Sequence, residues 1–158
     1  MAENYLRLSD TISAHEGKAY ITINGQNREL FEISALTAQI DLIVQERRML
    51  GHRMTQHKVV GATGTGSMTM YFMNSEMLNQ AIQYIRNGQF KGFKLQVKNE
   101  DPASTIGKQE VVLLNVIPAS IPAAILDDQS DDPITFDTDF TFDDIENLES
   151  FKLPENYR

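Results

Sequence analysis

The sequence contains no cysteine, which excludes disulfide bonds, thiolate metal sites and a cysteine nucleophile. It has no apolar run approaching the ~20 residues that a membrane-spanning helix needs. Residues 1–10 lack the basic start and the apolar stretch of a secretory signal. We therefore expect a protein that is synthesised and folded in a cytoplasm and has no membrane anchor.

The composition suits one folded domain over residues 1–158, since 41% of the residues are hydrophobic and a chain of this length can bury a core. The net charge of −8 is unevenly distributed, because residues 127–158 hold eleven acids and two bases while residues 1–126 are nearly balanced. A chain this acidic is poorly suited to tight nucleic-acid binding, because phosphates repel carboxylates.

Several motifs that would indicate a chemical function are absent from the sequence. The glycine run Gly61–Gly66 precedes a predicted strand rather than a helix and carries no Gly-Lys-Ser/Thr triplet, so a phosphate loop is not indicated. His52 and His57 stand among cations that would repel a metal ion. The acids of residues 127–139 lack EF-hand spacing, and no nucleophile elbow is present. We predict no cofactor, no metal and no enzymatic activity.

Alternation of apolar and polar residues predicts a mainly β protein. The dipeptide Asn24-Gly25 predicts a tight hairpin turn, and residues 110–117 are apolar on both faces, which predicts a strand covered on both sides. We expect a terminal arm at 1–17, a terminal tail at 144–158, and strands over residues 19–23, 26–30, 36–45, 67–72, 93–98, 110–117 and 134–143.

One helix is expected between Ser75, as its N-cap, and Gly88, just past its end. Its apolar residues recur at helical spacing and predict a stripe that covers one end or face of a sheet. The stripe consists of Leu78, Ala81, Ile82 and Ile85. The sum is a single domain built as a β-barrel or two packed sheets with one flanking helix.

Residues 47–66 are predicted to form a long, basic loop between two strands. A compact domain rarely carries so long a connection without a use for it. Its cations and apolar residues indicate a contact surface for a substrate, a nucleic acid or another copy of the chain. The candidate contact residues are Arg47, Arg48, Met49, Leu50, His52, Arg53, Met54, His57 and Lys58.

The segments 47–58 and 61–66 resemble the signature of tail tube proteins of contractile bacteriophages, in particular the PBSX type of defective phages. The capped helix ending near Gly88, the strand 93–97 and the terminal pattern from Phe136 to Asp144 are similar to that family in the same order. The resemblance covers roughly residues 8–158.

The resemblance implies a tail-tube β-barrel or sandwich related to the type VI secretion tube fold. It implies hexameric rings that stack into a hollow tube inside a contractile sheath, with the sheath, baseplate and tail-terminator proteins as partners. The tube would belong to a virion tail or a bacteriocin particle. On contraction it would be driven through the target envelope, and in a phage DNA would pass through it.

Within that assembly the 47–66 loop is expected to lie on the next ring. Candidates for acids facing the lumen are Asp41, Glu110, Asp137 and Asp139, for each of which simple surface solvation is an equally good interpretation. Alternatives are a headless tail-like bacteriocin, a type VI-like secreted tube or effector, and a monomeric binding module whose basic loop grips an acidic ligand.

Overall fold

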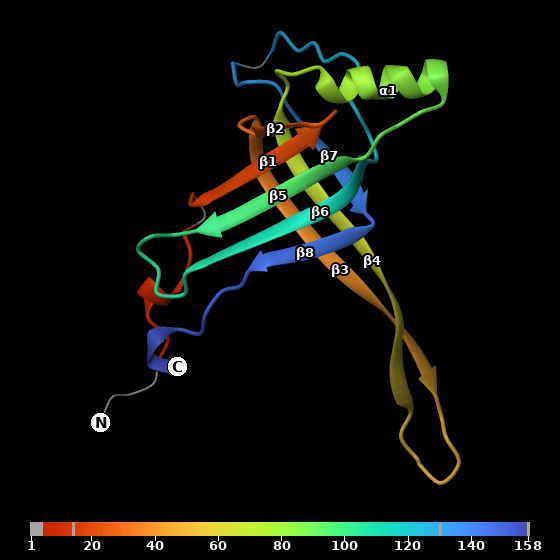
Figure 1. Cartoon of the computed structure of the whole chain (residues 1–158), viewed down its shortest axis with the longest axis vertical. Helices are drawn as coiled ribbons and strands as arrows, with labels where there is room; N and C mark the ends of the chain where they lie inside the picture. Colours follow the sequence, from red (N-terminus) through yellow and green to blue (C-terminus); the bar gives the residue numbers. More distant parts are fainter. Residues whose placement is uncertain (1–4, 14, 130, 158) are drawn as a thin grey trace.

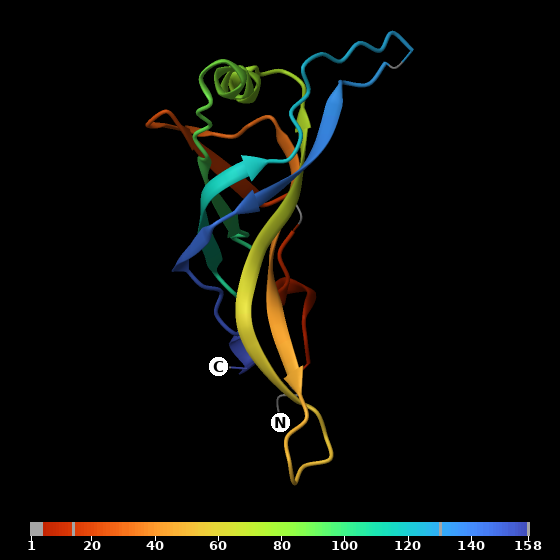
Figure 2. The same ribbon diagram turned by 90° about the vertical axis from the view of Figure 1, so that its right-hand side faces the viewer.

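The computed structural model describes residues 5–13, 15–129 and 131–157, and it is mainly β with one α-helix, as predicted (Figures 1 and 2). The elements are η1 (Leu8–Asp10), β1 (Gly17–Ile23), β2 (Gln26–Glu29), β3 (Ile33–Arg47), β4 (Gln56–Tyr71), α1 (Glu76–Asn87), β5 (Phe93–Glu100), β6 (Lys108–Pro118), β7 (Thr135–Phe142), β8 (Asp144–Glu149) and η2 (Glu155–Tyr157).

The strands form two antiparallel sheets that β6 joins (Figure 1). Sheet A consists of β2, β1, β5, β6 and β8, and sheet B consists of β7, β4 and β3 with the end of β6, where Ile117 and Pro118 pair with β7. The apolar faces of the two sheets enclose one core. Its buried residues are Ala19, Ile21, Leu30, Met68, Met70, Phe93, Leu95, Leu113, Val116, Phe140 and Phe142.

The predicted hairpin turn at Asn24-Gly25 is confirmed, because both residues have positive φ angles of 53° and 79° and β1 pairs with β2 on either side. The predicted helix is also present. Gly88 ends it at a φ of 72°, and its N–H donates to the Tyr84 carbonyl at 2.8 Å. Ser75 makes no side-chain cap, and the Asn74 carboxamide oxygen accepts from the Glu76 N–H at 2.8 Å instead.

The apolar stripe of α1 does not cover a sheet along its whole length, so that prediction is wrong for the second half of the helix. Leu78 and Ala81 are half-buried, but Ile82 is exposed and Ile85 is 79% exposed. The helix is instead held near its beginning by Met77, which packs on the core. Its C-terminal apolar surface therefore has no cover within the described part of the chain.

The predicted loop at 47–66 is corrected to a turn of residues 48–55, since β3 runs to Arg47 and β4 begins at Gln56. The glycine run lies within β4. Gly64 and Gly66 pair directly with Phe142 and Phe140 of β7, and a Cβ at either glycine would collide with the phenyl ring opposite. The two glycines therefore occupy strand positions that face the core, and the phenyl rings of β7 fill the space beside them. Because glycine is not an apolar side chain, the alternation of β4 cannot be recognised in the sequence there.

The predicted tail at 144–158 also contains structure, because Asp144–Glu149 forms β8 and pairs with β6. The described part of the predicted arm is attached to the body: the buried Asp10 carboxylate accepts from the Arg7 N–H at 3.0 Å and the Thr105 hydroxyl at 2.6 Å. These bonds hold the Asp10 pKa below its ordinary value, and the bond from the Thr105 hydroxyl has the largest effect. Residues 1–4 and 14 of the arm and residue 158 of the tail lie outside the described residues.

Candidate assembly surfaces

The β3–β4 hairpin extends far beyond the core and ends at the turn 48–55, at the end of the molecule opposite α1 (Figures 1 and 2). The register between the strands runs from Ile33 opposite Met70 to Arg47 opposite Gln56, with an irregularity between Ile43 and Val44. β3 is the last strand of sheet B, so one edge of this strand of 15 residues pairs with no other strand of the described chain.

The projecting part of the hairpin exposes apolar side chains. The residues are Ile40, Leu42, Ile43, Val44, Val59 and Val60, each about half exposed. Single exposed apolar residues are ordinary on a monomer, but a contiguous group on one element marks an interaction surface. An unpaired edge and uncovered apolar side chains thus occur on the same strand.

All nine predicted contact residues lie in the turn or at the strand ends beside it, and all are exposed. Gly51 has a φ of 82°, and the His52 N–H donates to the Met49 carbonyl at 3.3 Å, which shapes the turn. The His52 ring contacts the Met54 carbonyl at 3.1 Å. His57 lies 3.4 Å from Glu46. Within the described ranges, no group of three or more potential ligands has the geometry to hold a metal ion.

One face of sheet B is polar over three strands. Asp41, Asp137 and Asp139 all lie on it, because residues paired across antiparallel strands share a face. From Ala35 to Asp41 of β3 and across its partners, the face carries no cation; its other residues there are Ala35, Thr37 and Gln39 of β3, Thr63, Thr65, Ser67 and Thr69 of β4, and Thr141 of β7. Beyond them the same face continues to Ile43 of β3, to Ile117 of β6 and to the pair Tyr71 and Thr135.

Threonines hold two of these acids in place. The Thr65 hydroxyl donates to Asp41 at 3.2 Å, and the Thr69 hydroxyl donates to Asp137 at 2.6 Å. The fourth predicted lumen residue, Glu110, does not join them: it lies on β6, half-buried, and its carboxylate is 3.9 Å from the Lys98 ammonium. Of the four acids that the sequence offers as candidates for a lumen, three therefore share one face.

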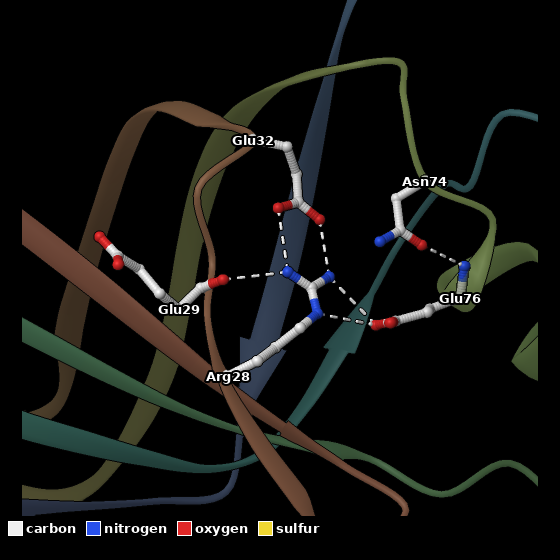
Figure 3. Close-up of polar contacts among 5 residues, drawn as sticks. All are labelled: Arg28, Glu29, Glu32, Asn74 and Glu76. Carbon is white, nitrogen blue, oxygen red and sulfur yellow. Dashed lines mark hydrogen bonds and ion pairs between the residues drawn. The ribbon is translucent and has the colours of Figure 1, made fainter.

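An ion cluster around the buried Glu32, which sequence reasoning missed, joins β2, the residue before β3 and α1 (Figure 3). The Arg28 guanidinium donates to both Glu32 carboxylate oxygens, at 2.7 and 3.1 Å, and to one Glu76 oxygen from two nitrogens, at 3.1 and 3.3 Å. Its Nη1 also donates to the Glu29 carbonyl at 3.0 Å. Glu32 closes the hairpin base as well, since its carbonyl accepts from the Tyr71 N–H at 2.8 Å.

The ionised state of this cluster follows from its contacts. Glu32 is 1% exposed, and burial opposes its charge, but the hydrogen bonds from Arg28 hold the Glu32 pKa below its ordinary value. The same hydrogen bonds, which the Glu32 and Glu76 carboxylates accept, raise the pKa of Arg28. Both groups are therefore charged at neutral pH, and the cluster links α1 to the sheet that carries the hairpin.

The fold is shared with chains found in solved structures of contractile injection systems. A chain in the sheath–tube complex of an extracellular contractile injection system in its extended state aligns with a TM-score of 0.67 and 12% identity, covering 90% of this chain and 95% of that one. A chain in the anti-feeding prophage baseplate, solved with six-fold symmetry, aligns with a TM-score of 0.64 and 15% identity, covering 94% and 97%.

The sequence relationship is more specific. The chain matches the phage tail tube protein family over residues 4–149 and belongs to it. It is 31% identical over 150 residues to the phage-like element PBSX protein XkdM of Bacillus subtilis (strain 168), covering 95% of each chain. The chain is therefore a tail tube protein. No helix in the described ranges has the length and apolar character needed to cross a membrane.

Proposed function

We propose that six copies of this chain form a ring and that the rings stack into the hollow tube of a contractile particle, either a phage tail or a tail-like bacteriocin. Sheath contraction would drive this tube through the target envelope. The role is structural rather than catalytic. A chain of the same fold occurs in a particle solved with six-fold symmetry, and another in a complex of sheath and tube, which supports this assembly.

Ring formation gives the open edge of sheet B a partner. The sheet has three full strands and the end of a fourth, so six copies would contribute ~24 strands. At ~4.8 Å between strands and ~40° of tilt, the closed barrel is roughly 48 Å across its backbone. Side chains cannot fill that width, so a channel remains.

The polar face of sheet B is proposed to line this channel. Its opposite face carries Met68, Met70 and Phe140, which pack into the core, so only the polar face remains to face a lumen. Asp41, Asp137 and Asp139 would make that lumen acidic. In a phage, an acidic wall would let DNA pass without trapping it, because phosphates and carboxylates repel each other.

The outer side of the ring is proposed to contact the sheath protein, with a baseplate at one end of the tube and a terminator at the other. The particle would be assembled in the bacterial cytoplasm before release. The hairpin turn 48–55, together with Arg47, His57 and Lys58, would project from one ring onto the next.

The exposed apolar surface of the projecting hairpin carries this proposal, because these side chains have no cover in the single chain. Negative-stain electron microscopy of the purified chain tests it. We expect rings and tubes from the natural sequence. Monomers alone at high concentration would contradict the proposal and favour the monomeric binding module.

A charge-reversed variant tests the role of the turn. Arg48→Glu with Arg53→Glu should leave rings intact but shorten or abolish tubes, since both residues are exposed and lie outside the core. Tubes of normal length from this variant would contradict an inter-ring role. Arg7→Glu with Lys94→Glu, which reverses two exposed charges elsewhere, is the matched control and should form normal tubes.

A further inference from the structure

The second half of α1 projects from one side of the molecule. Its first turn lies against sheet B, because Met77 and Leu78 line a small cavity together with Phe136 of β7. From there the helix runs past β7, away from β2 and β3 (Figure 1), and Figure 2 shows it end-on. Ile82 and Ile85 continue the apolar stripe onto this projecting half, where Ile85 is 79% exposed. The described chain therefore leaves this part of the stripe uncovered.

The opposite side of sheet B has an open apolar groove. It lies beside the unpaired edge of β3 and the beginning of β1 (Figure 1), and its apolar lining includes Leu30, Phe31, Ile33 and Leu36. Phe31 is 63% exposed, although the Arg28 guanidinium lies 5.5 Å from the centre of its ring. An uncovered apolar helix half on one side of the molecule thus corresponds to an open apolar groove on the other.

We propose that the projecting half of α1 packs into this groove of the neighbouring copy in the same ring. Ile82 and Ile85 contact the neighbour's Phe31, and Arg86 faces the neighbour's Glu29. This inference rests on the proposed function, and it identifies a contact that joins the copies of one ring in addition to their strand edges.

The dimensions of the ring agree with this contact. A barrel roughly 48 Å across gives each of six copies about 25 Å of circumference. A helix of 12 residues is ~18 Å long, so a helix that begins above β7 ends within the neighbouring copy's share of the ring. In Figure 2, which looks along the helix, the connection between β2 and β3 lies below the helix. A copy displaced along that line of sight brings the connection under the projecting half.

The contact combines apolar burial with one pair of opposite charges. Figure 3 shows the Glu29 carboxylate turned away from Arg28, which donates to the Glu29 carbonyl instead. Arg86 lies in the last turn of α1 and is also exposed. Burial of the apolar side chains supplies most of the affinity, and the charges set the orientation. Two different surfaces of the chain meet, so repetition around a six-fold axis closes a ring.

Cysteine cross-linking tests the contact without background, because the natural chain has no cysteine. The variant Phe31→Cys with Ile85→Cys is assembled, checked for rings by microscopy, treated with a short bismaleimide and analysed on a denaturing gel. We expect a covalent ladder that ends at six copies, since the links run around one closed ring. The control pairs Ile85→Cys with Glu146→Cys, an exposed residue of β8, and should give no ladder.

The outcomes separate this inference from the proposed function. Rings without a ladder would overturn the α1 contact while leaving the ring intact. A ladder that continues beyond six copies would place the contact between rings and would also overturn it. Failure of the natural chain to form rings or tubes would overturn the proposed function itself.

An exchange of charges decides the matter if the cysteine pair prevents assembly. Arg86→Glu and Glu29→Arg should each lower the fraction of chains in rings, and the two together should restore it. Sedimentation velocity measures this fraction at a concentration where the natural chain is partly assembled. Single variants that associate as well as the natural chain, or a double variant that associates no better than the single ones, would overturn the proposed contact.

Discussion

The two halves of the β3–β4 hairpin have the same kind of alternation but opposite surroundings. In the proximal half, residues 33–40 and 64–71, Met68 is only 3% exposed and packs in the core. In the distal half, residues 41–47 and 56–63, Ile43 and Val59 are 51% and 53% exposed. Alternation therefore specifies strands in both halves without specifying what covers them.

This difference separates two kinds of contribution to free energy. Substitutions in the proximal half change the stability of the single chain, because its side chains are buried within that chain. Substitutions in the distal half and the turn change association between copies and leave single-chain stability nearly unchanged. Matched pairs of variants on the two halves measure this separation.

The largest single-chain effect is expected at Met68. Met68→Ala leaves a cavity in the core and should lower the free energy of unfolding by about 2–5 kcal/mol in chemical denaturation. Met54→Ala removes the same side chain from the turn, where it is 73% exposed, and should change stability by less than about 0.5 kcal/mol while reducing tube length. Equal losses of stability for Met68→Ala and Met54→Ala would contradict the claim that only the proximal half stabilises the single chain.

The Arg28 cluster holds the base of the β3–β4 hairpin, because Glu32 immediately precedes β3 and its carbonyl accepts a hydrogen bond from Tyr71 of β4. Arg28→Met should destabilise the chain by about 3 kcal/mol, because it leaves a buried carboxylate without its cation. Arg28→Met with Glu32→Gln removes the uncompensated charge and should recover part of that loss. If Arg28→Met were as stable as the natural chain in thermal unfolding, the cluster would make no contribution to the free energy of unfolding.

The glycines of β4 provide a comparison within one strand. Gly66→Ala should cost about 1–3 kcal/mol, because the added methyl collides with the Phe140 ring and the Thr37 carbonyl. Gly61→Ala in the distal half meets only the Ile43 side chain at 3.4 Å and should be tolerated. The denaturation midpoints of the two variants measure which substitution is more destabilising. A larger loss of stability for Gly61→Ala than for Gly66→Ala would contradict this prediction.

The smallest expected effect is a pH dependence at Glu32. Its pKa in the folded chain is below the ordinary value of 4.5, so its stabilising contribution is complete above that value and is lost as pH falls through the folded pKa. The stability difference between the natural chain and Glu32→Gln should therefore shrink between pH 6 and pH 3. A difference that grows on acidification would contradict this assignment.

Much of the fold was predictable because local chemistry specified it. The Asn24-Gly25 turn, the helix with its Gly88 end, and the alternation of β7 were all identified from sequence and are present. The basic segment was correctly identified as a distinctive feature, but its length was overestimated because Gly64 and Gly66 interrupt the apolar pattern that Phe140 and Phe142 complete from another strand.

The rest depended on tertiary contacts. Strand β8 has the sequence Asp-Ile-Glu-Asn-Leu-Glu, which is poor in strand-forming residues and is ordered by pairing with β6. Arg28 and Glu32 are four residues apart but lie at a strand end rather than on a helix, so no periodic pattern marks their contact. Asp41, Asp137 and Asp139 share the polar face because of the register between β3, β4 and β7. The alternation within a single strand does not specify that register.

Backbone hydrogen exchange along β3 tests the central claim most directly, because the claim is that other copies complete this edge strand. Purified particles and a dilute, dissociated sample of the natural chain are compared by mass spectrometry. We predict that peptides within residues 36–46 exchange much more slowly in the particles, while peptides from β1 and β5 change little. Equal exchange of residues 36–46 in the two samples would contradict the claim that β3 is covered by assembly.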